Sequence, residues 1–410
     1  MENYKSQSAE YVHGFIKKVI ETTGPRLPGS EEEARAASLI AEEMEKATGN
    51  KAIIEPFKVA PVASIGAISV LGVITLITTA LFFISPLIGL ILSCLIFLYA
   101  ILQVFTYTGI FDFMWKQHTS HNVYSEVLPE NNSYDYTIMF SGHNDSSWHW
   151  NHSYKNPKTA LLKIGLGLLG LIVLIIVGAQ QVKLGNLFVW NSAKDVSTIV
   201  LYCLPVITLP GSFFIATFLT WNKALAAPGA MDNLSGVGFS ILMAKYFNEN
   251  KDKLPKNCRI ICAGLGSEEA GLKGSMAFVK KHKNEEWLKN TYVINLDSIR
   301  DYEHFNVVKG DLWLNSHFDK DLINMAVEAM KEVGRKGGVI INPIGGCDST
   351  PFSRIGVKTA TLIAQNPTLT DYYHTCKDVY EELDMRTLAD FSEVLLKLTD
   401  KVAAYHENSK

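Results

Sequence analysis

The sequence has little charge, few cysteines and no excess of basic residues, and each shortage narrows what the protein can be. Its 410 residues carry a formal net charge of −3, and a chain without a basic surface is a poor partner for nucleic acid. The 6 cysteines show no CxxC spacing, so we expect reduced thiols rather than a disulfide framework. The first residues contain no apolar run, and we expect no signal peptide there.

The shortage of charge is local. Charged residues make up 19% of the chain, against about 25% in soluble domains, and none occurs in residues 59–111, 164–182 or 196–222. A helix needs roughly 20 mostly apolar residues to cross a bilayer. The first run therefore has room for two spans, divided at Ser85-Pro86, and each of the others for one. Buried helices of a soluble core are the alternative.

Spans arranged as two hairpins return the chain each time to the side that it left. The remainder then shares one compartment and forms one main domain, interrupted by the hairpins. We expect this main domain at 1–58, 117–157 and 223–410, and the transmembrane hairpins at 59–116 and 158–222. In the last run, Pro205 and Pro210 predict a kink, which membrane helices tolerate.

Lysines near the ends of the spans predict the orientation. The tip of the second hairpin, about 180–195, carries Lys183 and Lys194. More lysines lie close to the spans on the main-domain side: Lys58, Lys116, Lys155, Lys158, Lys163 and Lys223. The positive-inside rule then places the main domain in the cytoplasm, as part of an integral membrane protein with four spans.

Outside the hairpins, strand and helix patterns alternate. We expect helices at 30–47, 233–248, 319–333 and 385–406, and strands at 52–57, 136–141, 259–264 and 292–296. Ser30, with Glu33 three residues later, predicts a capping box at the start of the first helix. This alternation is typical of an α/β fold, whose central sheet has helices on both faces.

Polar residues gather directly after these strands. The segments concerned are Ser141–Ser146, Gly266–Glu269 and Asn295–Ser298, joined by Pro228–Asn233 before a helix and Tyr372–Asp378 near the C-terminus. In α/β sheets, ligands bind at the carboxyl ends of the strands. Imidazole and carboxylate together suit zinc, with manganese or cobalt as possible substitutes. The sequence therefore predicts a metal site at this edge.

Taken together and in this order, the motifs resemble the co-catalytic di-zinc aminopeptidase family of secreted bacterial leucyl aminopeptidases. Its wider relatives include the glutamate carboxypeptidases, the transferrin receptor and the glutaminyl cyclases. The resemblance begins at Gly24-Pro25-Arg26-Leu27-Pro28-Gly29-Ser30 and ends past His374. It covers the chain apart from the hairpins and short loops. It implies the zinc exopeptidase fold with a mixed central sheet, here with four inserted transmembrane helices.

The resemblance implies two Zn²⁺ ions per chain. Asp232 would bridge them, Glu269 and His374 would complete one site, and His143 and Asp297 would complete the other. Taken alone, each residue has an ordinary alternative. Asp232, for example, could simply cap a helix.

The resemblance also implies two catalytic residues beside the ligands. Glu268 is the implied general base, which takes a proton from water and passes it to the leaving amine. Asp145 would accept the second N–H of His143 and fix its tautomer. Without the other motifs, the pair Glu268-Glu269 would be interpreted as two charged side chains exposed to solvent.

Near the C-terminus the chain departs from the family. The family often shows Ser-Asp-His before Pro-Phe, but here the run is Cys347-Asp348-Ser349-Thr350-Pro351-Phe352. Ser349 thus stands in place of a histidine that typically lies near the substrate pocket. The departure concerns specificity rather than the metals. No base pairs visibly with Cys347, so we do not expect it to be a nucleophile.

Two further patterns have competing interpretations. Gly165, Gly167 and Gly170 match GxGxxG, but they lie in a predicted span and follow no strand. We interpret them as close helix packing rather than nucleotide binding. The run from Trp148 to Tyr154 is rich in aromatic residues and histidine. It fits an interfacial aromatic belt, with a substrate lip or an extra metal ligand as the alternatives.

The sequence thus predicts a zinc metallopeptidase, most plainly an aminopeptidase acting on peptides near the membrane. The alternatives are hydrolysis of N-acyl amino acids or lipidated peptides, glutaminyl cyclisation, and an inactive receptor-like protein. Both hairpins follow strands that point to the metal edge, so we hypothesise that the active site faces the lipid bilayer. The oligomeric state is not determined by the sequence.

Overall fold

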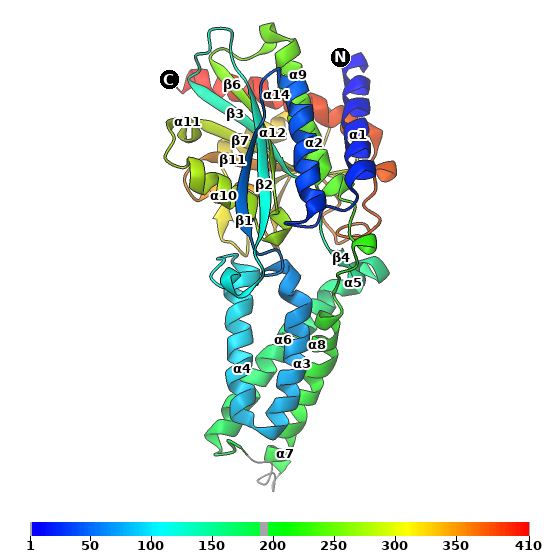
Figure 1. Ribbon diagram of the computed structural model, residues 1–410, viewed down its shortest axis with the longest axis vertical. Helices are drawn as coiled ribbons and strands as arrows, with labels where there is room; N and C mark the ends of the chain where they lie inside the picture. Colours follow the sequence, from blue (N-terminus) through cyan, green and yellow to red (C-terminus); the bar gives the residue numbers. More distant parts are fainter. Residues whose placement is uncertain (1, 189–195, 410) are drawn as a thin grey trace.

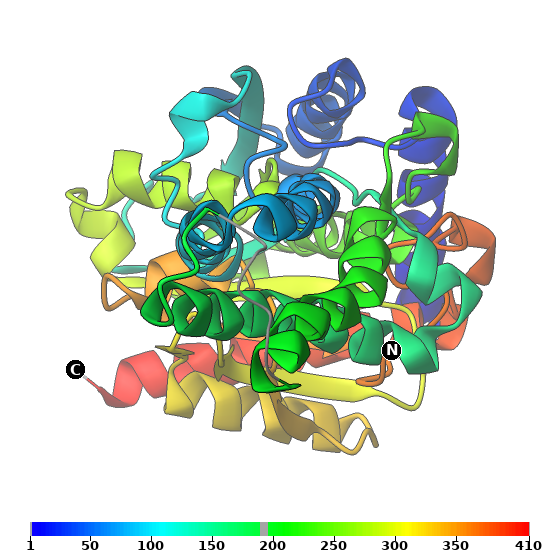
Figure 2. The ribbon, with the colours of Figure 1, turned by 90° about the horizontal axis from the view of Figure 1, so that it is seen from below.

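The computed structural model describes residues 2–188 and 196–409. Figure 1 shows a sheet-based part, which contains both ends of the chain, above a bundle of long helices. Seen from below, the bundle lies beneath the sheet (Figure 2).

A mixed sheet is the centre of the upper part. Its strands lie in the order β1 (Ile53–Val59), β2 (His118–Val127), β6 (Cys258–Leu265), β3 (Tyr136–His143), β7 (Thr291–Ile299), β11 (Lys358–Ala364), β8 (Phe305–Asp311) and β10 (Gly338–Asn342), and β9 (Ser316–His317) pairs with β8. Strands β6, β3, β7 and β11 are mutually parallel. Since β2 is antiparallel to both β1 and β6, β1 runs in the same direction as β3.

Helices cover both faces of this sheet. Alternate residues of the strands face opposite ways. Thus Ile138 and Ile260 join one apolar cluster, whereas Met139 and Ile261 join another. The first cluster packs under α1 (Glu2–Thr23), α2 (Glu31–Thr48), α9 (Ser235–Glu249), α12 (Lys320–Glu332) and α14 (Met385–Asn408). The second lies under α10 (Lys273–His282), α11 (Glu286–Lys289) and α13 (Ser349–Ser353). The predicted α/β fold class is confirmed.

The start of α2 differs in one bond from the predicted capping box. The Ser30 hydroxyl accepts a hydrogen bond from the Glu33 N–H at 3.1 Å. The Glu33 carboxylate, however, accepts from the Gly29 N–H at 2.7 Å rather than from that of Ser30. The expectation of a reciprocal box was wrong, because this carboxylate is turned into the core, where it accepts further hydrogen bonds from Ser120 and Ser267.

The lower part contains 4 helices that are long and apolar enough to cross a membrane: Ile65–Ile84, Pro86–Phe105, Pro157–Lys183 and Val196–Ala216. They comprise α3 (Ile68–Ile84), α4 (Pro86–Tyr99), α6 (Pro157–Lys183), and α7 (Val196–Cys203) with α8 (Thr208–Ala216). The chain turns at Ser85, as expected, and the last helix changes to a 3-10 turn over Leu204–Ile207, at Pro205. Of the predicted second tip, residues 189–195 lie outside the described residues.

Small residues let these helices approach one another. Helices α3 and α6 each pack against both α4 and α8. A Cβ added to Gly167 would lie 2.3 Å from Ile215 Cγ1, and one added to Gly170 would lie 3.1 Å from Thr208 Cβ. The predicted close packing is therefore confirmed for these two glycines. It was wrong for Gly165, where an added Cβ would meet nothing within 4 Å, because this residue faces away from the neighbouring helices.

Candidate metal centre

The carboxyl ends of β3, β6 and β7 bring most of the predicted site residues to one edge of the sheet. His143 ends β3, Asp297 lies near the end of β7, and Glu268 and Glu269 form the turn after β6. The loop before α9 adds Asp232, and the segment between β11 and α14 adds His374. Parallel strands that end together explain why residues so far apart in the sequence meet here.

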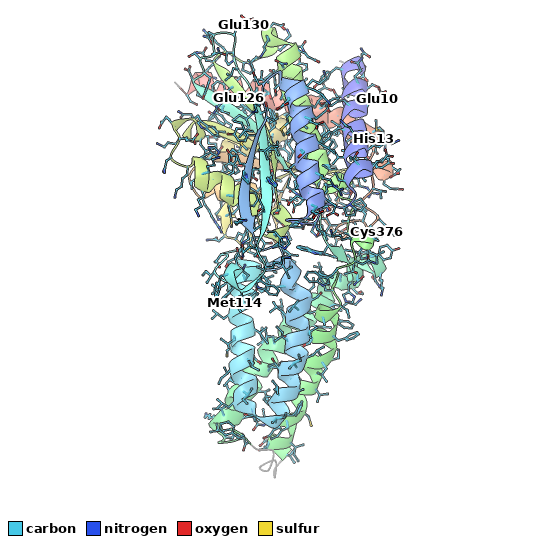
Figure 3. All side chains as sticks on the ribbon, viewed as in Figure 1. Glu10, His13, Met114, Glu126, Glu130 and Cys376 are labelled. Atoms are coloured by element: carbon cyan, nitrogen blue, oxygen red, sulfur yellow. The ribbon has the colours of Figure 1, made fainter. Side chains whose placement is uncertain are left out.

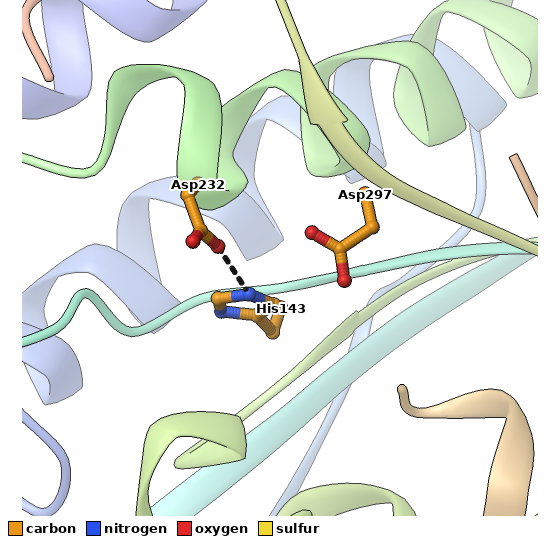
Figure 4. Close-up of side chains that lie close together, drawn as sticks. All are labelled: His143, Asp232 and Asp297. Atoms are coloured by element: carbon orange, nitrogen blue, oxygen red, sulfur yellow. Dashed lines mark hydrogen bonds and ion pairs between the residues drawn. The ribbon is translucent and has the colours of Figure 1, made fainter. Parts of the chain in front are cut away.

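The carboxylate of Asp232 lies between two imidazoles. Its Oδ1 is 2.9 Å from His143 Nε2, and its Oδ2 is 3.0 Å from His374 Nε2. Figure 4 shows Asp232 reaching toward His143, with the Asp297 carboxylate beside them. The peptide bond between Asp232 and Asn233 is cis.

The potential ligand atoms fall into two groups that share Asp232. His143, Asp232 and Asp297 form one group, and Asp232, Glu269 and His374 form the other, with the ligand atoms of each within 4.8 Å of one another. Within the second group, His374 Nε2 lies 3.1 Å from Glu269 Oε1. These are the same two sets that the resemblance implies, although their role as ligands stays a prediction.

The chemistry of this cluster fits a divalent cation. His143, Asp232, Glu269 and His374 are all buried, and Glu269 Oε1 has no hydrogen-bond partner among the described residues. Burial raises the pKa of Glu269 to about 8, with His374 opposing this shift and Asp232 adding to it. A buried carboxylate cluster needs positive charge to stay ionised, and a mixture of imidazole and carboxylate ligands is typical of zinc.

Glu268 lies beside the two groups without belonging to either. Its Oε2 is 4.0 Å from His143 Nε2, and 13% of its side chain is exposed. Burial raises the pKa of Glu268 well above its usual value; His143 opposes the shift and the neighbouring Glu269 adds to it. A carboxyl group in this position can exchange protons with a substrate at the metal groups.

Asp145 supports the site chiefly through the backbone. Its Oδ1 and Oδ2 accept hydrogen bonds from the N–H groups of Glu268 and Glu269, both at 2.9 Å. Its Oδ1 also lies 3.3 Å from Nδ1 of His143, the atom that the resemblance implies as its partner. Asp145 thereby links the loop after β3 to the turn after β6.

Sequence reasoning missed Arg26, which holds two loops of the site. This fully buried side chain donates to four backbone carbonyls: from Nε to Asn144 at 2.8 Å, from Nη1 to Pro228 at 2.7 Å and to Gly24 at 3.4 Å, and from Nη2 to Gly229 at 3.0 Å. The available signal was a single arginine inside the Gly24–Ser30 motif. A guanidinium presents a rigid fork of donors, which suits it to such a junction.

Two carboxylates with similar tasks were also missed. Glu33 accepts a hydrogen bond at 2.7 Å from the N–H of Ser267, the residue before Glu268. Asp378 accepts from the N–H groups of Met231 and Asp232, at 2.7 and 3.1 Å. Both are buried acids near named motifs, but only the fold shows which backbone they bind.

Ser349, the residue near the C-terminus that differs from the family's usual histidine, lies inside the protein. The Ser349 hydroxyl is fully buried and lies 2.8 Å from the hydroxyls of Thr359 and Thr361 on β11. It therefore packs on the sheet, where its hydroxyl is already hydrogen-bonded. Burial raises the pKa of Cys347 well above its ordinary value, which agrees with the expectation that it is no nucleophile.

The first residues of the aromatic run after the metal motif are turned into the protein. Trp148 and His149 are 3% exposed, and the ring of Trp150 lies 4.4 Å from that of His374. The belt interpretation was wrong for Trp148, which is buried against Phe218 and Leu219, and for Trp150, whose ring is turned toward His374. It stays a prediction for Tyr154, which is 41% exposed just before α6. His149 Nδ1 accepts a hydrogen bond from the Cys376 N–H at 3.1 Å, and among the described residues neither His149 nor His152 belongs to a metal group.

The hairpins leave from the edge that carries these groups. Strand β1 ends at Val59 before the first hairpin, and β3 ends at His143 before the second. Residues Ile65–Ala67, which begin the first span, contact the turn Glu268–Ala270. In Figure 1 the helix bundle accordingly lies directly under this edge of the sheet.

Comparison with known proteins agrees with this geometry. Residues 216–399 match peptidase family M28. Aminopeptidase YwaD of Bacillus subtilis (strain 168) is 27% identical over 177 residues, which are 41% of this chain and 36% of that protein. The chain thus matches about a third of the length of this curated relative.

Solved structures share the fold at low sequence identity. A zinc aminopeptidase from Bacillus subtilis has a TM-score of 0.58 at 16% identity, covering 96% of this chain and 95% of its own. An aminopeptidase from an Aneurinibacillus strain has 0.56 at 14%, covering 97% and 95%. A glutaminyl cyclase from Bacteroides thetaiotaomicron has 0.55 at 14%, covering 95% and 96%. The predicted family resemblance and zinc exopeptidase fold are confirmed, and this family implies zinc binding.

Proposed function

We propose that this chain, a member of peptidase family M28 through its residues 216–399, is a zinc-dependent aminopeptidase that removes N-terminal residues from peptides near the membrane. The observation that carries the proposal is the Asp232 carboxylate between His143 and His374. It gives two ligand groups with one shared member. That arrangement supports two zinc ions per chain, with cobalt or manganese as substitutes.

Each side chain then has a defined task. Zinc supplies, when bound, polarisation of the scissile carbonyl and activation of water. Glu268 accepts a proton from the attacking water on its carboxylate and delivers it to the leaving amine. Asp145 keeps Glu268 and Glu269 oriented through their backbone N–H groups.

Turnover and metal content test the proposal together. Purified protein should bind close to two zinc ions per chain and release the first residue of an unblocked peptide, and a chelator should stop the reaction. A single zinc with cyclisation of N-terminal glutamine would favour a glutaminyl cyclase, whose fold this chain shares. Turnover of N-acyl amino acids or lipidated peptides alone would favour amidohydrolysis. Zinc binding without any turnover would favour a receptor-like protein.

The candidate spans support an integral membrane protein. Hairpins at 59–116 and 158–222 would cross the bilayer, with the main domain (1–58, 117–157 and 223–410) in the cytoplasm. The four apolar helices and the lysines beside the main domain support this topology. Single cysteines introduced at the two hairpin tips in a cysteine-free variant should react with an impermeant maleimide added outside intact cells. A cysteine introduced in the exposed loop near Glu130 should not react. The reverse pattern would overturn the orientation.

A further inference from the structure

The segment that follows the second candidate span puts an aromatic ring against the turn Glu268–Ala270. Tyr107 is 4% exposed. A Cβ added to Gly271, just after the Glu268–Ala270 turn, would lie 2.9 Å from Tyr107 Cδ1, and one added to Gly345 would lie 3.5 Å from the Tyr107 hydroxyl. The ring therefore extends from the catalytic turn to the loop around Gly345. Leu272 packs against it.

The segment before the second hairpin places another aromatic ring beside His374, a proposed metal ligand. The Trp150 ring stands nearly perpendicular to that of His374, with centroids 4.4 Å apart, and its backbone N–H donates to the His374 carbonyl at 2.8 Å. Trp150 belongs to β4 (His149–Trp150), which pairs with β5 (Leu219–Thr220) just after the last candidate span. The two ends of this hairpin thus hold the indole at the metal centre.

Apolar contacts connect these two rings to the membrane helices. Ile65, the first residue of the first span, packs against the cluster of Tyr107, Leu272 and Leu314. It also packs against a second cluster, formed by Trp148, Phe218 and Leu219, which Ile68, Ile164 and Trp150 contact as well. Apolar contacts therefore lead from the surroundings of the metal centre into the candidate spans. They run beside a buried polar cluster at the same junction, in which Lys273 pairs with Asp112.

Large apolar side chains are exposed where the two parts join. Phe113, in the segment after the second candidate span, is 78% exposed, and its neighbours Ile110 and Met114 are exposed too. Figure 3 shows Met114 beside the upper end of α4. Exposed apolar side chains gathered in this way mark a contact surface, and their continuity with the spans identifies the contact as the lipid headgroup region.

We infer that the hairpins supply apolar walls for the substrate site, Tyr107 on one side and Trp150 on the other. The substrate is a membrane-bound peptide whose first residue is apolar. This deepens the proposed aminopeptidase function and rests on it. A charged first side chain would have to lose its hydration against these two rings, whereas an apolar one gains by burial. A peptide held in the bilayer would reach the metal centre near Ile65, where the first span begins.

Peptide turnover by the full-length protein in nanodiscs tests the inference. Matched heptapeptides would begin with Leu or Glu, each with or without a C-terminal palmitoyl chain, in phosphatidylcholine discs. We expect kcat/KM about tenfold higher for Leu than for Glu, since a buried side chain of this size is worth at least 1.4 kcal/mol. The palmitoyl form should gain a further factor of about ten. Equal rates for Leu and Glu, or no gain from the acyl chain, would overturn the inference.

Variants of the two aromatic residues distinguish a change in substrate preference from a general loss of activity. Tyr107→Ala and Trp150→Ala should raise KM for the Leu peptide and bring the Leu/Glu ratio close to one, with zinc content unchanged. Tyr107→Phe should keep the ratio, because the apolar ring remains. Tyr134→Ala, in the loop near Glu130 at the far end of the sheet (Figure 3), is the matched control. An unchanged ratio in both alanine variants that retain zinc would contradict the assignment of the walls.

The same set of peptides tests the inferred substrate class separately from the proposed aminopeptidase activity. If the wild-type protein binds zinc but cleaves none of the peptides, the proposed aminopeptidase function fails. If it cleaves them all at similar rates, the function stands and only the substrate class is wrong. Should the alanine variants lose zinc or fail to fold, the comparison of Leu with Glu in the wild-type protein still decides the question.

Discussion

Asp378 holds the backbone of Asp232, the residue whose carboxylate lies between the two imidazoles. The Oδ2 of Asp378 accepts a hydrogen bond from the Asp232 backbone N–H at 3.1 Å, and its Oδ1 accepts one from the preceding N–H at 2.7 Å. Asp378 is 1% exposed, so little water competes for these bonds. The residue shared by both metal groups is thus fixed by a carboxylate that contacts neither imidazole in the described hydrogen bonds.

Replacing this carboxylate should weaken metal binding. In Asp378→Asn only one amide oxygen remains to accept the two N–H groups, and the Asp232 loop loses part of its support. We expect zinc affinity to fall about 10–100-fold, as for other residues that orient ligands, measured by competition with a chromogenic chelator. Asp371→Asn is the control, because Asp371 is exposed in the same loop, where it pairs with Lys377. Equal affinities for both variants would contradict the positioning role.

The proposed base should be separable from metal binding. Glu268→Gln keeps the shape of the side chain but cannot take a proton, so activity should fall by about 10²–10⁴-fold. Zinc content should stay at the wild-type value, because Glu268 lies outside both metal groups. The measurement is kcat beside elemental analysis of the same preparation. Full activity in this variant would remove Glu268 from the mechanism.

Zinc stoichiometry should report which residue is shared. Asp297→Ala removes a member of one group only, and Asp232→Ala removes a member of both. We therefore expect about half of the wild-type zinc in the first variant and almost none in the second, measured by inductively coupled plasma mass spectrometry after dialysis. The same loss of zinc in both variants would argue against two separate sites.

Arg26→Lys should lower stability although the charge is kept. Lysine has one ammonium in place of a planar fork, so at least one of the buried carbonyls of Asn144, Pro228 and Gly229 loses its donor. An unsatisfied buried group costs about 1–3 kcal/mol, which for a chain of 410 residues corresponds to a decrease in Tm of about 1–4 °C. Arg35→Lys, on the exposed face of α2, is the control. Differential scanning fluorimetry in detergent should show no shift for that control.

Two glycines in the bundle of candidate spans should respond in opposite ways to the same change. A Cβ on Gly72 would lie 2.2 Å from the backbone N of Ala216, so Gly72→Ala should force α3 away from α8 and lower Tm. Gly165→Ala meets nothing within 4 Å and should leave Tm unchanged or raise it slightly, because alanine is the better helix former by about 1 kcal/mol. A similar loss in both variants would mean that helix packing is not the reason for Gly72.

Much of the fold could be predicted from local patterns. Runs without charge located the candidate spans, and Ser85-Pro86 marked the turn of the first hairpin because its proline can begin a helix but not continue one. Strand positions followed from short apolar segments, and His143 and Asp297 from their place at strand ends. What local patterns could not show was the partner of each polar group. The carboxylate of Glu33 accepts from the distant N–H of Ser267 as well as from Gly29, and Trp148 is buried although it lies near a candidate span.

The sequence by itself determined the types of candidate metal ligand and their order along the chain, because residue type sets metal preference. It also determined which segments suit water and which suit lipid, because hydropathy sets the surroundings in which a helix is stable. Only the tertiary structure decided that Asp232 lies between His143 and His374, and that Arg26 and Asp378 hold the loops on which the site depends. These are distances between atoms far apart in the chain. They depend on how parallel strands align and on which buried backbone groups still need a hydrogen-bond partner.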